Sequence, residues 1–186
     1  MQIGIGRKIR MIQLFDKKGR QLPATEIRVE QSIISQIRTQ EVDGYQAIQL
    51  AVKKGKKQEF RILTDQSEAK ELKKGQKLDR EAFSEAKSLD VSGFSKGKGF
   101  QGVIKKYNFS RGPKSHGSHH YRRTGAIGQC AIPARVFKGK KMPGRMGNQK
   151  VTIKNLQVIK QEKDSIYLKG GVPGPKGSYL ALRGVK

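Results

Sequence analysis

The chain has 186 residues, which is enough for one domain and short for two, and its formal net charge is +25. Only 34% of the residues are hydrophobic, so we expect a core to serve part of the chain and the rest to depend on a partner for its order. No apolar run is long enough for a membrane span or a secretory signal, and the lone Cys130 excludes an internal disulfide, so we expect a soluble, cytosolic protein.

Short β-like runs separated by turn signals fill the first part of the sequence. The candidate strands are residues 9–15, 26–30, 33–39 and 45–52. The fourth strand follows an Asp43-Gly44 turn and places Ile48, Leu50 and Val52 on one face. Because turns rather than helices separate these runs, they predict an antiparallel sheet or barrel.

Two helical turns and three more strands are expected further along the chain. Residues 79–87 fit a short helix capped by Asp79, with Phe83 and Ala86 at helical spacing. Residues 102–108 fit a single helical turn. Strand patterning returns in residues 151–158, 166–168 and 179–182.

Acidic residues are missing from residues 91–161, although sixteen lysines and arginines lie there. A cationic segment without internal counter-charge needs an external anion, and nucleic acid is the commonest dense polyanion. Eleven glycines and three prolines between positions 93 and 147 also make regular structure sparse. The sequence therefore predicts an irregular segment that binds nucleic acid.

These patterns predict a mainly β fold. Its globular domain is expected to comprise residues 1–92 and 149–186, from both ends of the chain, with a long, basic, largely irregular extension (residues 93–148) inserted between them. Loops longer than about 15 residues in a compact domain are usually functional or disordered. We find no internal repeat.

Two glycine-rich motifs lie in the extension. Residues 95–102, SKGKGFQG, place cations among glycines that let backbone amides approach a phosphate, although taken alone a flexible linker is the simpler explanation. They lack the P-loop signature and so give no support to nucleotide hydrolysis. Residues 136–147, VFKGKKMPGRMG, add Phe137, Met142 and Met146, which disordered basic tails usually lack. This second motif is typical of a folded binding element.

All three histidines lie in residues 115–123, SHGSHHYRR. No acid is nearby and Cys130 is ten residues beyond His120, which argues against a metal site. Aromatic rings and guanidinium planes stack on unpaired bases, so the segment favours RNA, with a solvated loop as an equal alternative. Without a carboxylate to orient a general base, we predict no catalytic residue. A reactive Cys130 thiolate is conceivable, but an incidental cysteine is the more frequent case.

Six motifs stand out in order along the chain: residues 5–11, 43–49, 90–102, 125–129, 136–148 and 169–174. Together they resemble the large-subunit ribosomal protein L-three family in its bacterial form. The likeness spans nearly the whole chain. It implies a non-enzymatic structural protein of the large ribosomal subunit, in cytoplasmic ribosomes of bacterial or organellar type.

The resemblance also implies a fold and partners. Family members have a translation-protein-type β-barrel and an extension that threads through rRNA toward the peptidyl-transferase centre, and they bind early in assembly near the 3′ region of the large-subunit rRNA. Residues 93–102 and 136–148 match the base and stem of that extension, and residues 119–133 match its inner end. Neighbouring large-subunit proteins are further expected partners, whereas no membrane, cofactor or small-molecule substrate is expected.

The predicted rRNA-binding side chains are cationic, aromatic, imidazole or amide groups of the extension and its edge. They are Lys96, Lys98, Phe100, Lys105, Lys106, Arg111, Lys114, His116, His119, His120, Tyr121, Arg122, Arg123, Gln129, Arg135, Phe137, Lys138, Lys140, Lys141, Arg145 and Lys150.

Three departures from the family pattern accompany this resemblance. Arg10 stands where the family has a glycine, which argues against a tight turn there. Ala131 stands at the place of a glutamine that is often methylated, so we predict no such modification. The chain is also short for the family, and the expected deletion lies between residues 51 and 65.

Two rival functions stay open at this point. A DNA-compacting architectural protein would share the charge, but it would bind duplex DNA and structured rRNA about equally. An RNA-modifying enzyme would need a cofactor pocket or a nucleophile. Neither a dinucleotide-binding fingerprint nor a metal constellation is evident in the sequence.

Overall fold

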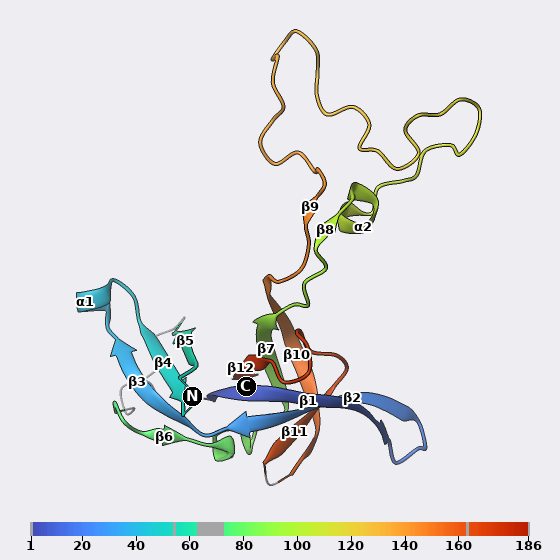
Figure 1. Cartoon of the computed structure of the whole chain (residues 1–186). Coiled ribbons are helices and arrows are strands. Elements are labelled where there is room, and N and C mark those ends of the chain that lie inside the picture. Colours follow the sequence, from blue (N-terminus) through green and yellow to red (C-terminus); the bar gives the residue numbers. More distant parts are fainter. Residues whose placement is uncertain (1, 54, 63–72, 163, 186) are drawn as a thin grey trace. The chain divides into compact units, whose positions relative to one another are not determined.

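The computed structural model describes residues 2–53, 55–62, 73–162 and 164–185. The chain divides into two compact units, Met1–Ser95 with Lys150–Lys186 (unit 1) and Lys96–Gln149 (unit 2). The regular structure is mainly β, as the alternating runs predict, and nearly all of it belongs to unit 1 (Figure 1). The deletion expected between residues 51 and 65 falls partly outside the described residues.

Six strands of unit 1 pair with one another in a closed ring (Figure 1). The order around the ring is β1 (Ile3–Phe15), β12 (Tyr179–Val185), β7 (Ser88–Phe94), β10 (Lys150–Gln161), β11 (Ser165–Lys169) and β2 (Gln21–Glu30), which pairs again with β1. All six pairings are antiparallel. Strands from both ends of the sequence therefore meet in one sheet.

The interior of the ring follows from the two-residue period of its strands. In β7, Leu89 and Val91 point inward and are fully buried, while the alternating residues Ser88, Asp90 and Ser92 are partly exposed. They pack with Leu180 and Leu182 of β12 in one core cluster. Gly93 continues the inward face because an added Cβ would lie 2.6 Å from the Leu180 side chain. In β7 and β12, every second residue thus faces the core.

A second sheet of unit 1 packs against the start of β1. Its strand order is β5 (Lys57–Arg61), β4 (Ala47–Val52), β3 (Ser32–Arg38) and β6 (Lys77–Leu78). Ile48, Leu50 and Val52 are buried together, which confirms the face predicted for this strand. Ile3 and Ile5 of β1 complete this second core cluster. The expected early strands therefore divide between two sheets rather than forming one.

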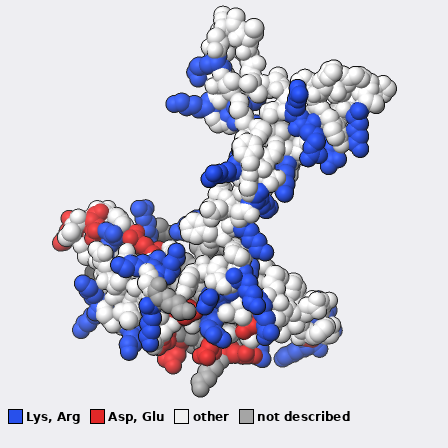
Figure 2. Space-filling view, viewed as in Figure 1, with Lys and Arg blue, Asp and Glu red and all other residues white. Residues whose placement is uncertain are grey.

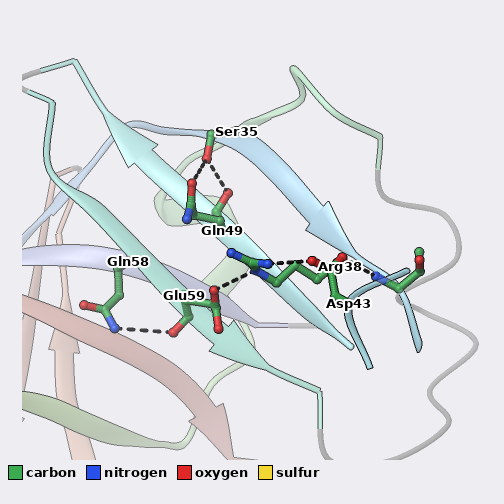
Figure 3. Close-up of polar contacts among 7 residues, drawn as sticks. Ser35, Arg38, Asp43, Gln49, Gln58 and Glu59 are labelled. Atoms are coloured by element: carbon green, nitrogen blue, oxygen red, sulfur yellow. Dashed lines mark hydrogen bonds and ion pairs between the residues drawn. The ribbon is translucent and has the colours of Figure 1, made fainter. Parts of the chain in front are cut away.

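Arg38 ties the second sheet to the turn that follows it (Figure 3). Its Nη1 donates a hydrogen bond to Asp43 Oδ1 at 2.5 Å, and its Nε donates one to Glu59 Oε2 at 3.0 Å. The bond to Asp43 raises the pKa of the Arg38 guanidinium. Asp43 ends the short helix α1 (Gln40–Asp43), and Gly44 caps it with a left-handed φ of 74°. The predicted Asp43-Gly44 turn is confirmed.

The structure corrects several predicted elements. β1 begins at Ile3, well before residue 9. It has a bulge between Lys8 and Arg10 and makes no tight turn there, in agreement with the argument from Arg10. The strands β5 and β7 were not predicted, because β5 is mostly polar and β7 carries only two large inward side chains. Residues 79–87 contain only a 3₁₀ turn, η2 (Arg80–Phe83), and the Asp79 side chain makes no capping bond.

The junction of β10 and β11 is organised by a carboxylate. Glu162 accepts hydrogen bonds from Lys160 Nζ at 2.6 Å and from the Tyr167 hydroxyl at 2.9 Å. The bond from Lys160, followed by the one from Tyr167, lowers the pKa of Glu162 below its usual 4.5. The hydrogen bond between Tyr167 and Glu162 also raises the pKa of Tyr167 above 10.0, because ionisation of Tyr167 would remove the proton that it donates.

We expect this junction to make unit 1 sensitive to acid. Because the folded pKa of Glu162 lies below the unfolded value, its contribution is complete above pH 4.5 and is lost as the pH falls through the folded pKa. A Glu162→Gln variant should therefore show a flatter decline of melting temperature between pH 5 and pH 3, by about 1–3 °C. The exposed Glu85→Gln variant is the control, and an identical decline in both variants would contradict the assignment.

Candidate nucleic-acid interface

Two segments of the chain connect unit 2 to unit 1, and they pair with each other. We call this paired region the base of unit 2. The strands β8 (Phe100–Gln101) and β9 (Gly144–Arg145) form a short antiparallel ladder. Next to it, the Lys98 N–H donates to the Met146 carbonyl, and the Met146 N–H donates to the Gly99 carbonyl, both at 2.9 Å. The two glycine-rich motifs singled out in the sequence therefore hold each other.

Gly147 allows the two segments at this base to approach closely. Its φ is +78°, and an added Cβ would lie 2.1 Å from the Lys96 carbonyl oxygen. Real Cβ atoms essentially never come that near to another atom, so only glycine fits here. The sequence marks the position only as one glycine among many.

The helix α2 (Val103–Tyr107) follows β8 and confirms the helical turn predicted for residues 102–108. Gly102 precedes it, and Asn108 ends it in the left-handed region with φ 59°. The Asn108 N–H donates to the Ile104 carbonyl at 2.9 Å. Val103 is the only buried apolar side chain of unit 2, whose residues are all described. The helix therefore rests on a small apolar contact.

Aromatic rings attract the cations of unit 2. The ring of Tyr107 has Lys106 Nζ at 5.1 Å and Lys141 Nζ at 5.8 Å from its centroid. The guanidinium of Arg135 lies 5.0 Å from the centroid of Phe137. Such cation–π contacts are worth about 0.5–1 kcal/mol at exposed sites. They orient cations that have no carboxylate within their own unit, since unit 2 contains none.

The histidine-rich segment forms a loop that is closed by a backbone hydrogen bond. The Gly112 N–H donates to the Tyr121 carbonyl at 3.0 Å, and Lys114 Nζ lies 5.8 Å from the centroid of the Tyr121 ring. His116 adopts a left-handed φ of 58°. His119 and His120 are exposed, as is Cys130 further on. The loop therefore presents its imidazoles to the surroundings rather than to a core.

Two other kinds of feature are missing from the part of the chain that the structure describes. No group of three or more histidine, cysteine, aspartate or glutamate side chains is placed to hold a metal ion. No described helix combines the length and the apolar character needed to cross a membrane.

The structure places all the predicted rRNA-binding residues in unit 2 except Lys150, which begins β10 in unit 1. All of them are exposed or half-buried, and Lys106, Tyr121 and Gln129 lie on three different parts of unit 2. Among the described residues, every salt bridge lies in unit 1. Figure 2 shows blue side chains along unit 2 and no red ones. The cations of unit 2 thus face outward without carboxylate partners.

The structure also brings together cations of unit 1 that the sequence did not indicate. A groove of about 470 Å³ is lined by Arg61 of β5, Lys154 of β10 and Arg183 of β12, next to Lys150. Glu59 and Asp90 lie in the same groove, so its charge is mixed. These residues come from distant parts of the chain, and only the pairing of their strands makes them neighbours. No local signal could have identified them.

Comparison with known proteins agrees with this arrangement. A family model described as ribosomal protein L3 matches residues 48–165. The chain is 42% identical to the large ribosomal subunit protein uL3 of Syntrophus aciditrophicus, over 96% of this chain and 91% of that protein. It is 39% identical to the proteins of the same name from Alkaliphilus metalliredigens and Thermotoga petrophila, over 96% and 100% of this chain and 95% and 98% of those proteins. The chain therefore belongs to the ribosomal protein L3 (uL3) family.

Proposed function

We propose that this chain is a structural, non-enzymatic component of the large ribosomal subunit that binds rRNA chiefly through unit 2. Its relatives are named as large-subunit proteins, which supports a role in translation in cytoplasmic ribosomes of the bacterial type. One observation carries the proposal of rRNA binding. Unit 2 exposes many cations and contains no carboxylate, so its neutralising charge must come from another molecule.

The physical roles divide between charge and shape. Lysine ammonium groups neutralise phosphates, which gives affinity without sequence preference. The exposed ring of Phe100 and the Arg135–Phe137 pair offer flat surfaces on which unpaired bases stack. The paired base of unit 2 and the capped helix α2 keep these groups on defined backbone. Position on the RNA therefore comes from the shape of unit 2.

The finer proposal follows the family resemblance. The ring of unit 1 is a barrel of the translation-protein type, and residues 93–148 penetrate rRNA toward the peptidyl-transferase centre, whose surroundings they brace. Binding near the 3′ region of the large-subunit rRNA nucleates assembly, with neighbouring large-subunit proteins as further partners. The scarcity of buried apolar side chains in unit 2 supports a segment whose order depends on RNA.

Removing clustered lysines should lower the salt dependence of rRNA binding. Lys138, Lys140 and Lys141 are all exposed, so changing each to glutamine should leave the fold intact. If each contacts one phosphate, the slope of log affinity against log salt should become less negative by about 2 to 3. Filter binding of large-subunit rRNA over a series of salt concentrations measures that slope.

The matched control changes three exposed lysines of unit 1 to glutamine: Lys53, Lys56 and Lys57. It removes the same charge, so an equal flattening of the slope would show that net charge rather than unit 2 determines binding. Competition with duplex DNA separates the rival function, because a DNA-compacting protein would bind both nucleic acids about equally. We expect structured rRNA to compete much better than duplex DNA of equal length.

A further inference from the structure

The hairpin formed by β1 and β2 continues beyond the other strands of the ring (Figure 1). β12 pairs with β1 only from Ile3 to Arg7, and β11 pairs with β2 only from Ala24 to Arg28. Residues 10–15 of β1 therefore pair only with β2, and residues 21–23 of β2 pair only with β1. We call residues 10–23 the free hairpin.

The free hairpin carries large apolar side chains on both of its faces. Its large apolar side chains are Met11, Ile12, Leu14, Phe15, Leu22 and Pro23. Met11 is 54% exposed and Phe15 is 72% exposed. Met11 and Phe15 share one face of β1 with Gln13, which lies between them. On this face, Met11, Gln13 and Pro23 line part of an open groove of about 780 Å³. In Figure 2 this part of unit 1 is largely white, with blue side chains at its edge. Such a surface is typical of a contact site for another molecule.

The two edges of the free hairpin differ. On β2, Pro23 has no N–H to offer, and its carbonyl already accepts the Gly170 N–H at 2.8 Å. On β1, no described strand pairs with residues 10–15 on the side away from β2. An apolar strand edge of this kind is a template for another strand and favours aggregation unless it is covered.

The charges near the β1 edge indicate the chemistry of what covers it. Arg10 is bonded to Glu26 at 2.7 Å, and Arg20 lies 3.3 Å from Asp16, so these cations are already paired. The ammonium groups of the neighbouring residues Lys17 and Lys18 are exposed and form no salt bridge with a described residue. Residues 11–15 carry no charge, so they cannot neutralise a row of phosphates.

We propose that the β1 edge of the free hairpin binds an extended segment of a neighbouring ribosomal protein, with apolar side chains against Met11 and Phe15 and carboxylates near Lys17 and Lys18. The segment adds a strand to β1, so main-chain hydrogen bonds give affinity and alternate side chains give specificity. This inference rests on the proposed function, because the partner is present only in the assembled subunit.

Site-specific photo-crosslinking in purified large subunits tests the proposal. A benzophenone amino acid is placed at Phe15 in one variant and at Ile132 of unit 2 in another; both side chains are strongly exposed. We expect the Phe15 variant to form an adduct with another protein, mapped by mass spectrometry to an extended, acid-containing segment. The Ile132 variant should form an adduct with rRNA.

The outcomes distinguish this inference from the proposed function. An rRNA adduct, an adduct between two copies of this chain, or no adduct from the Phe15 variant would overturn the hairpin proposal alone. Failure of both variants to enter large subunits would instead contradict the proposed function.

A charge reversal adds a second readout. Changing Lys17 and Lys18 to glutamate in the Phe15 benzophenone variant should reduce the protein adduct about tenfold, since like charges would then face each other. Changing Lys53 and Lys56 to glutamate is the control and should leave the yield unchanged. An unchanged yield in the Lys17 and Lys18 variant would overturn the acidic assignment.

Discussion

Replacing Gly147 by alanine is expected to open the base of unit 2. A non-glycine residue in the left-handed region costs roughly 1–2 kcal/mol, and the added Cβ would also lie 2.1 Å from the Lys96 carbonyl oxygen. The backbone must therefore shift, which breaks the bonds of the Lys98 and Met146 amides. We expect both amides to exchange with solvent at least about tenfold faster than in the unchanged chain. Hydrogen exchange resolved to single residues measures this.

Gly139 supplies a matched control for that substitution. It has a similar φ of +81°, but an added Cβ would meet nothing within 4 Å. Gly139→Ala therefore keeps the left-handed strain without the collision, and we expect exchange at the base to change little. Equal acceleration by the two substitutions would show that strain alone, rather than close approach, makes Gly147 necessary.

Deleting residues 112–133 and bridging the gap with a short Gly-Ser linker is expected to separate stability from function. Both core clusters of buried side chains lie in unit 1, so the variant should keep a cooperative thermal transition within a few degrees of the parent. Large subunits assembled with it should form slowly or be defective, because the proposed inner end of the extension is missing. Calorimetry and sucrose-gradient profiles measure the two effects.

A Leu182→Ala variant gives the reciprocal control. Leu182 is fully buried in the ring core, and such truncations typically cost about 2–5 kcal/mol. It should lower the melting temperature strongly while leaving residues 112–133 unchanged. If the deletion abolished the cooperative transition instead, unit 1 would not be the independent core of the protein.

Local elements were predictable where neighbours in sequence determine them. The period-two run containing Ile48 and Leu50 identified the buried face of β4, because alternate residues share a face whatever the strand pairs with. The helical turn after Gly102 was predicted, and Asn108 then ends it in a conformation that suits asparagine. Short-range sterics and periodicity are sufficient in both cases.

Pairing between distant strands could not be predicted. Nothing local indicates that Leu182 of β12 lies opposite Val91 of β7, or that β3 and β4 leave the ring to form a second sheet. The groove cations Arg61, Lys154 and Arg183 could not be predicted either, because only the pairing of distant strands brings them together. The cations of unit 2 were found because they cluster in sequence, and their contacts with RNA stay a prediction.

The pairing of β1 with β12 has a consequence for synthesis on a translating ribosome. Ile3 lies opposite Arg183. The first strand to be synthesised, β1, therefore cannot complete its pairing until β12, near the end of the chain, has been made. The sixteen cations of residues 91–161 and the open edges of β1 and β7 are exposed to the cytosol during that interval. Contacts so far apart in sequence form slowly, so we expect early capture by chaperones or RNA to protect the nascent chain from aggregation.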